Sequence, residues 1–235
     1  MDRVVTNPHA FDFKEGEVLL FDKPKGWTSF DLVRKVRYLI KEKKVGHAGT
    51  LDPLASGLMI LCTGKKTKAI SVIQDAPKQY IATYRFGSTT PSFDLETTPV
   101  DFKDTSGLTA DIIADAMQKF LGKTSQLPPV YSAIKVDGKR AYESARKGIA
   151  LELKHREIEI TSYDLIEFRA PDVALVKVNC SKGTYIRTLA HDLGQALGTG
   201  AYMEGLVRTA IGNYLLADAW EIEKFAGLMN KEVTK

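Results

Sequence analysis

The sequence is poor in cysteine, with two among 235 residues, Cys62 and Cys180. They lie far apart, each in an apolar or strand-like segment, which favours buried free thiols in a reducing compartment. A single disulfide between them is the alternative. No apolar stretch approaches the length of a membrane span, and residues 1–10 lack the apolar core of a signal peptide. We therefore expect a cytoplasmic protein with no membrane partner.

Common metal and cofactor motifs are also missing. The four histidines are scattered, and neither cysteine has a second ligand at metal-binding spacing. The string TGKKTK is not a Walker loop, because Met59 stands where its first glycine would be. No strand is followed by G-x-G-x-x-G, and there is no G-x-S-x-G elbow. We expect no metal and no cofactor.

What is present is a dense turn within the segment from Lys44 to Lys68, KVGHAGTLDPLASGLMILCTGKKTK. It places one carboxylate, Asp52, between His47 and the apolar run 58–61. Its glycines and proline outnumber what a chain reversal needs, which favours a turn that aims Asp52. The alternative is an Asx-turn, in which Asp52 only accepts hydrogen bonds from nearby backbone N–H groups.

Basic residues gather on both sides of this turn, although the net charge is only +4. They are Arg34, Lys35, Arg37, Lys41, Lys43 and Lys44 before it, and Lys65, Lys66 and Lys68 after it. Such a collar indicates an anionic partner such as a phosphate backbone. A solvated helix face rich in lysine and arginine would give the same pattern.

Hydrophobic spacing predicts a mixture of strands and helices. Strands are expected at 17–22, 58–62, 80–87, 156–169, 173–181 and around 205–208, and helices at 30–41, 67–74, 109–121, 184–197 and 217–229. Thr28 or Ser29 is expected to cap the first helix. Residues 88–107 are expected to form a loop. Arg187 falls in a helical first turn, where the dipole disfavours a cation, so we expect a carboxylate partner for it.

The segment 126–148 combines basic and aromatic residues around an Asp137-Gly138 turn. The mixture is typical of a flexible element that clamps nucleic acid. An exposed hairpin and helix with ordinary surface charge is the alternative.

Six blocks, in the family's order, resemble the TruB-type tRNA pseudouridine synthases. They are DKPKGWTS (22–29), GHAGTLDPLASGL (46–58), GKKTK (64–68), KQY (78–80), QLPPVYSAIKVDGKRAYESARKG (126–148) and GTYIRTLAHDLG (183–194). The resemblance covers residues 17–215 and implies an α+β fold, a curved, mostly antiparallel sheet with flanking helices and a catalytic cleft. It also implies isomerisation of uridine to pseudouridine at position 55, in the T-loop of tRNA, by base flipping.

The resemblance also implies which residues act. Asp52 matches the catalytic aspartate, Tyr80 the tyrosine that packs on the base, and Arg187 the arginine that pairs with the aspartate. Substrate-binding positions fall on His47, Lys23, Tyr185, Leu206 and Arg208. The block 126–148 resembles the thumb that closes on the T-arm. Whether Asp52 attacks the sugar, attacks the base or acts as a general base stays open.

The sequence departs from the family at Ser92, where threonine is frequent, and at Val207, where arginine is frequent. Many relatives continue into a C-terminal PUA-like domain, whereas here we expect one catalytic domain over 1–235, acting as a monomer without a protein partner. Two rival functions remain. One is non-catalytic RNA binding on the same scaffold, and the other is an N-glycosylase that releases free uracil, which would need a second carboxylate to activate water.

Overall fold

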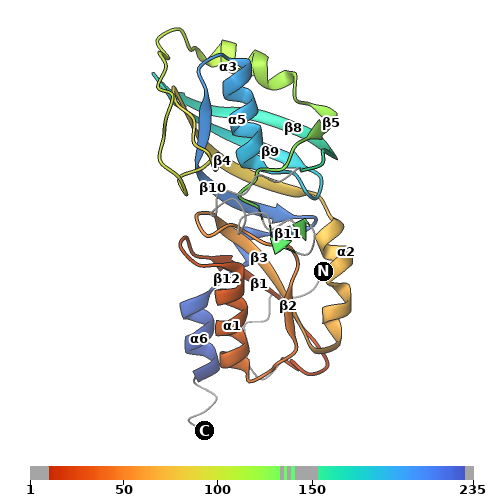
Figure 1. Ribbon diagram of the computed structural model, residues 1–235. Coiled ribbons are helices and arrows are strands. Elements are labelled where there is room, and N and C mark those ends of the chain that lie inside the picture. Colours follow the sequence, from red (N-terminus) through yellow and green to blue (C-terminus); the bar gives the residue numbers. More distant parts are fainter. Residues whose placement is uncertain (1–10, 133–134, 137–138, 141–152, 231–235) are drawn as a thin grey trace. The chain divides into compact units, whose positions relative to one another are not determined.

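The computed structural model describes residues 11–132, 135–136, 139–140 and 153–230. The chain divides into two compact units. Figure 1 shows the helices and strands, coloured along the sequence from the N-terminus in red to the C-terminus in blue. The first unit combines Met1–Tyr80 with Val207–Lys235, and the second is Ile81–Leu206. Strands β4 (Lys78–Phe86) and β10 (Ala201–Ile211) each have residues in both units.

The first unit is a sheet with helices on both faces. In chain order, its remaining elements are β1 (Val18–Lys23), α1 (Ser29–Ile40), β2 (Val45–His47), β3 (Ser56–Thr63), η2 (Gly64–Ala69), α2 (Ile70–Asp75), β11 (Tyr214–Leu215), η3 (Leu216–Asp218), β12 (Trp220–Glu221) and α6 (Ile222–Asn230). β3 pairs antiparallel with β1 and β2 and parallel with β10, while β12 adds to β1 in parallel. The C-terminal segment therefore completes a sheet begun by the N-terminal one.

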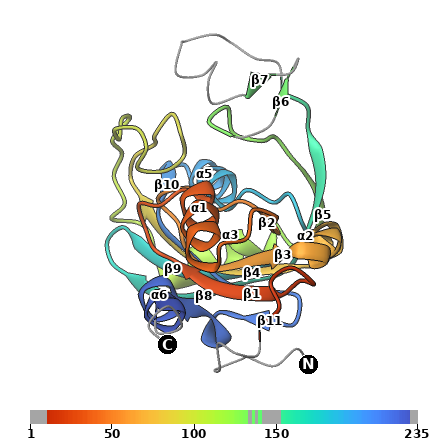
Figure 2. The same cartoon turned by 90° about the horizontal axis from the view of Figure 1, so that it is seen from below.

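Alternation along β1 and β3 produces two apolar cores in this unit, because successive strand residues face opposite sides. Leu19, Phe21, Met59 and Leu61 face α1 and α6. The opposite face packs against α2. Figures 1 and 2 show α1 and α6 beside the strands they cover.

Helix α1 begins at a capping box. The Thr28 hydroxyl accepts the Asp31 backbone N–H at 3.1 Å, and the Asp31 carboxylate accepts the Thr28 backbone N–H at 3.0 Å. Two N–H groups that the first turn would leave unpaired are thereby satisfied. Of the two caps expected, the structure uses Thr28, which leaves the Ser29 hydroxyl for another task.

The second unit is an antiparallel sheet covered by helices. Besides parts of β4 and β10, its elements are α3 (Ala110–Gln118), β5 (Gly122–Gln126), β6 (Lys135–Val136), β7 (Lys139–Arg140), β8 (Arg156–Arg169), β9 (Val173–Cys180) and α5 (Ile186–Ala196). β8 pairs with β5 and β9, and β6 pairs with β7. α3 and α5 pack on the sheet (Figure 1), where Tyr84 and Tyr163 lie fully buried.

Most predicted elements are confirmed, including α1, β3, α3, α5 and the strand pair β8 and β9. Two predicted helices begin later than expected, and one strand was not predicted. Residues 67–69 form the end of a 3-10 helix, residues 122–126 form an unpredicted strand, and the last helix begins at Ile222. Both cysteines are free and buried, as expected. Much of the expected thumb, 133–134, 137–138 and 141–148, lies outside the described residues. In the described part of the chain, no helix is long and apolar enough to cross a membrane.

Candidate active site

Asp52 lies half-buried in the connection from β2 to β3. The turn closes where the Ala55 N–H donates to the Asp52 carbonyl at 3.1 Å. On one side, the buried Ser29 hydroxyl donates to the Leu51 carbonyl at 3.1 Å and accepts the Leu51 N–H at 2.9 Å. On the other, the Gly26 N–H donates to the Pro53 carbonyl at 2.7 Å. The backbone on both sides of Asp52 is therefore anchored to the segment that starts α1.

Arg208 anchors the same turn from β10. Its guanidinium donates to the carbonyls of Leu58 at 2.8 Å, Gly49 at 3.3 Å and Thr50 at 3.4 Å, and the residue is only 1% exposed. We expected Arg208 to bind substrate. Since its donors point at backbone carbonyls, the geometry favours a positioning role for it.

Gly57 explains part of the glycine density. Its φ of +102° lies in the left-handed region, and an added Cβ would come 2.4 Å from the Arg208 carbonyl. Only glycine fits where β3 passes this close to β10. The dense glycine pattern therefore reflects backbone packing around Arg208 as well as the shape of the turn.

Lys23 is fully buried at the end of β1, and its ammonium donates to the carbonyls of Trp27 at 2.7 Å and Pro24 at 3.0 Å. Burial lowers the pKa of Lys23 to about 8, although the nearby Asp52 carboxylate opposes the shift and favours the charged form. Burial also lowers the pKa of His47, which favours the neutral form of its imidazole. The buried Lys23 ammonium, which loses its proton more easily than an exposed lysine, therefore lies near Asp52.

Tyr80 is the third residue of β4 and is 8% exposed. Residues at alternate positions of β4 are buried, as the period-two pattern predicted. Its neighbour Gln79 accepts a hydrogen bond from the Thr209 hydroxyl of β10 through its side-chain oxygen at 3.0 Å. The backbone that carries Tyr80 is thereby held next to that of Arg208.

In the second unit, Arg187 occupies the first turn of α5, and its carboxylate partner there is Asp94. Their side chains are 3.5 Å apart and are 3% and 4% exposed. Removing one partner of an ion pair this buried is strongly destabilising, because it leaves the other charge buried and unpaired. Asp94 was not among the predicted site residues. The cation at a helix N-terminus predicted a carboxylate partner, whereas the resemblance implied Asp52 as the partner of Arg187, a pairing that stays a prediction.

Tyr185 caps α5 and is fixed through its backbone. The Gln126 side chain donates to the Tyr185 carbonyl at 3.1 Å and accepts its N–H at 2.8 Å. The guanidinium of Arg187 lies 5.9 Å from the centre of the Tyr185 ring, and that of Arg156 lies 5.7 Å from it. Leu206 is half-buried in β10. The two units thus each hold part of the predicted site: Asp52, Tyr80, Lys23, His47 and Arg208 in the first, and Arg187, Tyr185 and Leu206 in the second.

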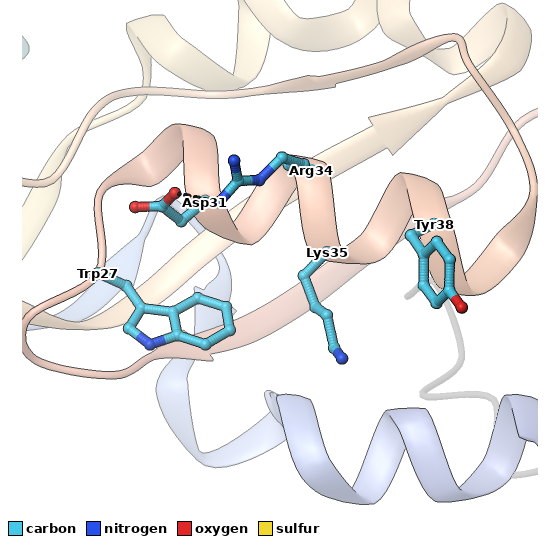
Figure 3. A pocket seen from close by; sticks show the side chains of 5 residues that line it. All are labelled: Trp27, Asp31, Arg34, Lys35 and Tyr38. Atoms are coloured by element: carbon cyan, nitrogen blue, oxygen red, sulfur yellow. Dashed lines mark hydrogen bonds and ion pairs between the residues drawn. The ribbon is translucent and has the colours of Figure 1, made fainter.

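A groove of about 450 Å³, the α1 groove, is lined by Trp27 and by the α1 residues Asp31, Arg34, Lys35 and Tyr38. Figure 3 shows Trp27 and Tyr38 toward its ends and Lys35 between them, while Arg34 pairs with Asp31 at 3.0 Å. Tyr38 is 77% exposed. The basic collar is only partly available as a surface, since Arg37 donates to the Val45 carbonyl and Lys65 pairs with Glu15.

Known proteins resemble this chain in sequence and in fold. Residues 37–186 match the family described as TruB family pseudouridylate synthase (N terminal domain), and 187–234 match the tRNA pseudouridylate synthase B C-terminal domain. Proteins named tRNA pseudouridine synthase B from Phocaeicola vulgatus and Parabacteroides distasonis are 51% and 49% identical. The alignments cover 94% and 95% of this chain and 96% and 97% of theirs.

Among solved structures, a chain of a Cbf5-Nop10-Gar1 complex is 28% identical with a TM-score of 0.70. The match covers 92% of this chain and 54% of that one. Fold and family matches together define an enzyme of the pseudouridine synthase class, with a mixed α/β architecture. Within that class, the chain belongs to the TruB family of pseudouridylate synthases.

Proposed function

We propose that the protein isomerises uridine to pseudouridine in the T-loop of tRNA, at position 55. Relatives about half identical over nearly their whole length carry the name tRNA pseudouridine synthase B, which supports tRNA as the substrate. The observation that carries the proposal is the anchored turn around Asp52, held by Ser29, Gly26 and Arg208. A carboxylate fixed in this way is suited to covalent or general-base catalysis.

The reaction needs no redox partner and no donated group. The bond between a uracil nitrogen and a ribose carbon breaks, the uracil turns, and a carbon of the base bonds to the same ribose carbon. The base carbon then loses its proton, and the freed nitrogen gains one. Asp52 acts as a nucleophile toward the sugar or the base, or as a base toward the ribose. Since bonds are only exchanged within the nucleotide, no cofactor enters the proposal.

Tyr80 and Arg187 are proposed to act with Asp52 on the same uridine. Tyr80 offers a flat ring for stacking, worth roughly 1 to 3 kcal/mol per base. Arg187 supplies a positive charge that keeps a poorly hydrated carboxylate ionised. His47, Lys23, Tyr185 and Leu206 contribute to binding the nucleotide, while Arg208 holds the turn that carries Asp52.

The T-loop uridine must leave its stack before any carboxylate reaches it, at a cost of a few kcal/mol. Contacts elsewhere on the RNA offset that cost. We propose the α1 groove as one such contact, because it combines exposed Tyr38, half-buried Trp27 and the cations Lys35 and Arg34. Aromatic rings with neighbouring cations suit unstacked bases and their phosphates. The segment 126–148 is proposed as a second contact, with the T-arm.

The enzyme is further proposed to work in the cytoplasm as a monomer, without an obligate protein partner. The described helices include none that could cross a membrane. Gel filtration with light scattering at the concentration of the activity assay tests the monomer, and a dimer mass would contradict it.

The test of the function is incubation with unmodified tRNA and with an isolated T-arm hairpin, followed by sequencing for pseudouridine. We expect product at the T-loop uridine with the wild-type protein and none with Asp52→Asn. Asp218→Asn, which changes an exposed carboxylate of the first unit, serves as the matched control and should act like the wild type. Absence of product with the wild type, or full product with Asp52→Asn, would overturn the proposal.

Two further measurements separate the rival functions. Chromatography of the small-molecule fraction detects free uracil, which an N-glycosylase releases and an isomerase retains. RNA binding without any product identifies a non-catalytic binding protein. Product at another uridine of the tRNA would contradict the T-loop assignment while leaving the chemistry intact.

A further inference from the structure

The loop that carries Asp94 docks on α5 through two consecutive residues. Asp94 meets Arg187 at 3.5 Å, and Phe93 stacks on His191 with ring centroids 3.9 Å apart and planes at 18°. Arg187 and His191 lie four residues apart in α5, which places them on one helix face, one turn apart. The loop is therefore held by an ion pair and by a ring stack side by side.

Phe93 has an unusual backbone conformation. Its φ of 63° lies in the left-handed region, which residues with bulky side chains avoid. Such a conformation persists where the surroundings determine it. The Phe93 N–H donates to the Thr90 carbonyl at 3.1 Å, and the Phe93 carbonyl accepts the Met203 N–H at 2.9 Å. The stack on His191 adds a side-chain contact to these backbone bonds.

Asp94 is oriented by its own loop. The hydroxyls of Thr90 and Ser92 donate to its backbone carbonyl at 2.8 Å and 3.1 Å. The Glu96 N–H donates to one carboxylate oxygen, Oδ1, at 2.9 Å, while Oδ2 is the atom that faces Arg187. Both Asp94 and Arg187 are almost completely buried, so a shift of the loop would leave a buried charge poorly paired.

We propose that Phe93 and His191 are positioning residues, whose stack fixes Asp94 against Arg187 and thereby sets the orientation of the Arg187 guanidinium. The inference rests on the proposed function, in which Arg187 acts on the reacting uridine. His191 itself touches no substrate in this proposal. It acts through Phe93, the neighbour of Asp94.

The first test measures coupling without reference to activity. Urea unfolding is followed for the wild type, His191→Ala, Asp94→Asn and the double variant. We expect His191→Ala to lower the unfolding midpoint of the wild type and to lower that of Asp94→Asn by clearly less, because the stack and the ion pair share one loop. Gln195→Ala, one turn further along α5 and exposed, is the control and should leave the midpoint unchanged.

The second test measures single-site kinetics on the T-arm hairpin. His191→Ala and Phe93→Ala are each expected to lower kcat roughly three- to tenfold, which is the rate factor that corresponds to the free energy of one aromatic ring contact. KM is expected to change less than about twofold. His191→Phe keeps a ring on Phe93 and should restore kcat to near the wild-type value. A contact that only stabilises the fold predicts normal kcat for every variant that is folded at the assay temperature.

Three results would overturn the inference: additive midpoint shifts in His191→Ala and Asp94→Asn, normal kcat in folded His191→Ala, or a His191→Phe variant as slow as His191→Ala. Failure of the proposed function is distinguished from these, because it appears as a wild-type protein that forms no pseudouridine. An active wild type together with a His191→Ala variant of normal kcat contradicts only the positioning role and leaves the proposed function in place.

Discussion

At the scale of single residues, two buried cations of the first unit, Arg208 and Lys23, lie near Asp52 and differ in their hydrogen-bond partners and in the effect of burial on their charge. Arg208 spreads its guanidinium donors over three backbone carbonyls of the Asp52 turn and of β3. Lys23 has two carbonyl partners and an ammonium that burial makes easier to deprotonate. Arginine therefore serves as a permanent anchor of the turn, whereas lysine supplies a charge that depends on pH.

Lys23 should make the free energy of unfolding depend on pH. Its pKa falls from 10.5 to about 8 on folding, so between these values the unfolded chain binds more protons and stability rises with pH. Below pH 8 both states are charged, and the cost of burying the ammonium is fully present. Relative to Lys23→Met, we expect the wild type to gain roughly 2 to 3 kcal/mol between pH 7 and pH 10.

Urea titrations of both proteins at several pH values measure this difference. Lys119→Met, which removes an exposed lysine, is the control and should run parallel to the wild type. A constant difference between wild type and Lys23→Met over the same range would show that the pKa of Lys23 is not lowered on folding.

Ser29 should matter more than a surface serine, because its hydroxyl both donates to and accepts from the Leu51 backbone next to Asp52. In Ser29→Ala, two buried backbone groups lose their partner, at a cost of roughly 1 to 3 kcal/mol. We expect a lower free energy of unfolding together with a lower kcat, since the turn that aims Asp52 loosens. Ser106→Ala, on an exposed loop, is the control; a Ser29→Ala enzyme with normal kcat would contradict the anchoring role.

At the scale of elements, α1 has two functions on two faces. One face carries Leu32, Val33 and Val36 into the core, and the helix start holds the Asp52 turn through Ser29. The other face exposes Tyr38 and the side chain of Arg34, at 77% and 73%. Because the exposed side chains contribute little to packing, they can be changed without loss of the fold.

The α1 groove should therefore be separable from catalysis. We expect Lys35→Glu combined with Tyr38→Ala to weaken tRNA binding by roughly tenfold or more, from one lost stacking partner and a reversed charge. The dependence of affinity on salt should also become shallower. Fluorescence anisotropy with labelled tRNA at several salt concentrations measures both, and saturating RNA should return near-normal kcat. Lys119→Glu is the charge-matched control; unchanged affinity in the groove variant would remove α1 from the RNA interface.

At the scale of the whole molecule, sequence predicted the elements whose pattern is local. β1, β3, β8 and β9 show runs or alternation of apolar residues, and α1 shows both helical spacing and a cap. β5 could not be found this way, because GKTSQ has no apolar alternation and is a strand through its pairing with β8. The short β12 likewise depends on β1, a partner about two hundred residues earlier in the chain.

The residues of the candidate site fall into the same two groups, those with a local sequence pattern and those whose role depends on long-range contacts. Asp52, Tyr80 and Arg187 follow from motifs that are contiguous in sequence. Asp94 was missed because its role depends on how the loop from 88 to 107 meets α5, a long-range contact without a local signature. The anchoring role of Arg208 was missed for the same reason, since its partners lie about 150 residues away in the Asp52 turn.

The expectation of a single domain remains to be tested, because the chain forms two compact units. β4 and β10 each have residues in both, so unfolding one unit would break strands that the other uses. Phe225→Ala removes a fully buried ring from the α1 and α6 core, at a cost of roughly 3 to 5 kcal/mol.

If the chain is one cooperative domain, hydrogen exchange should accelerate in β9 of the second unit as much as in β1 of the first. Phe102→Ala, which truncates a side chain that is 78% exposed, should leave both unchanged. Retained protection in β9 together with lost protection in β1 would contradict the single domain. It would also mean that the half of the site with Asp52 can unfold while the half with Arg187 stays intact.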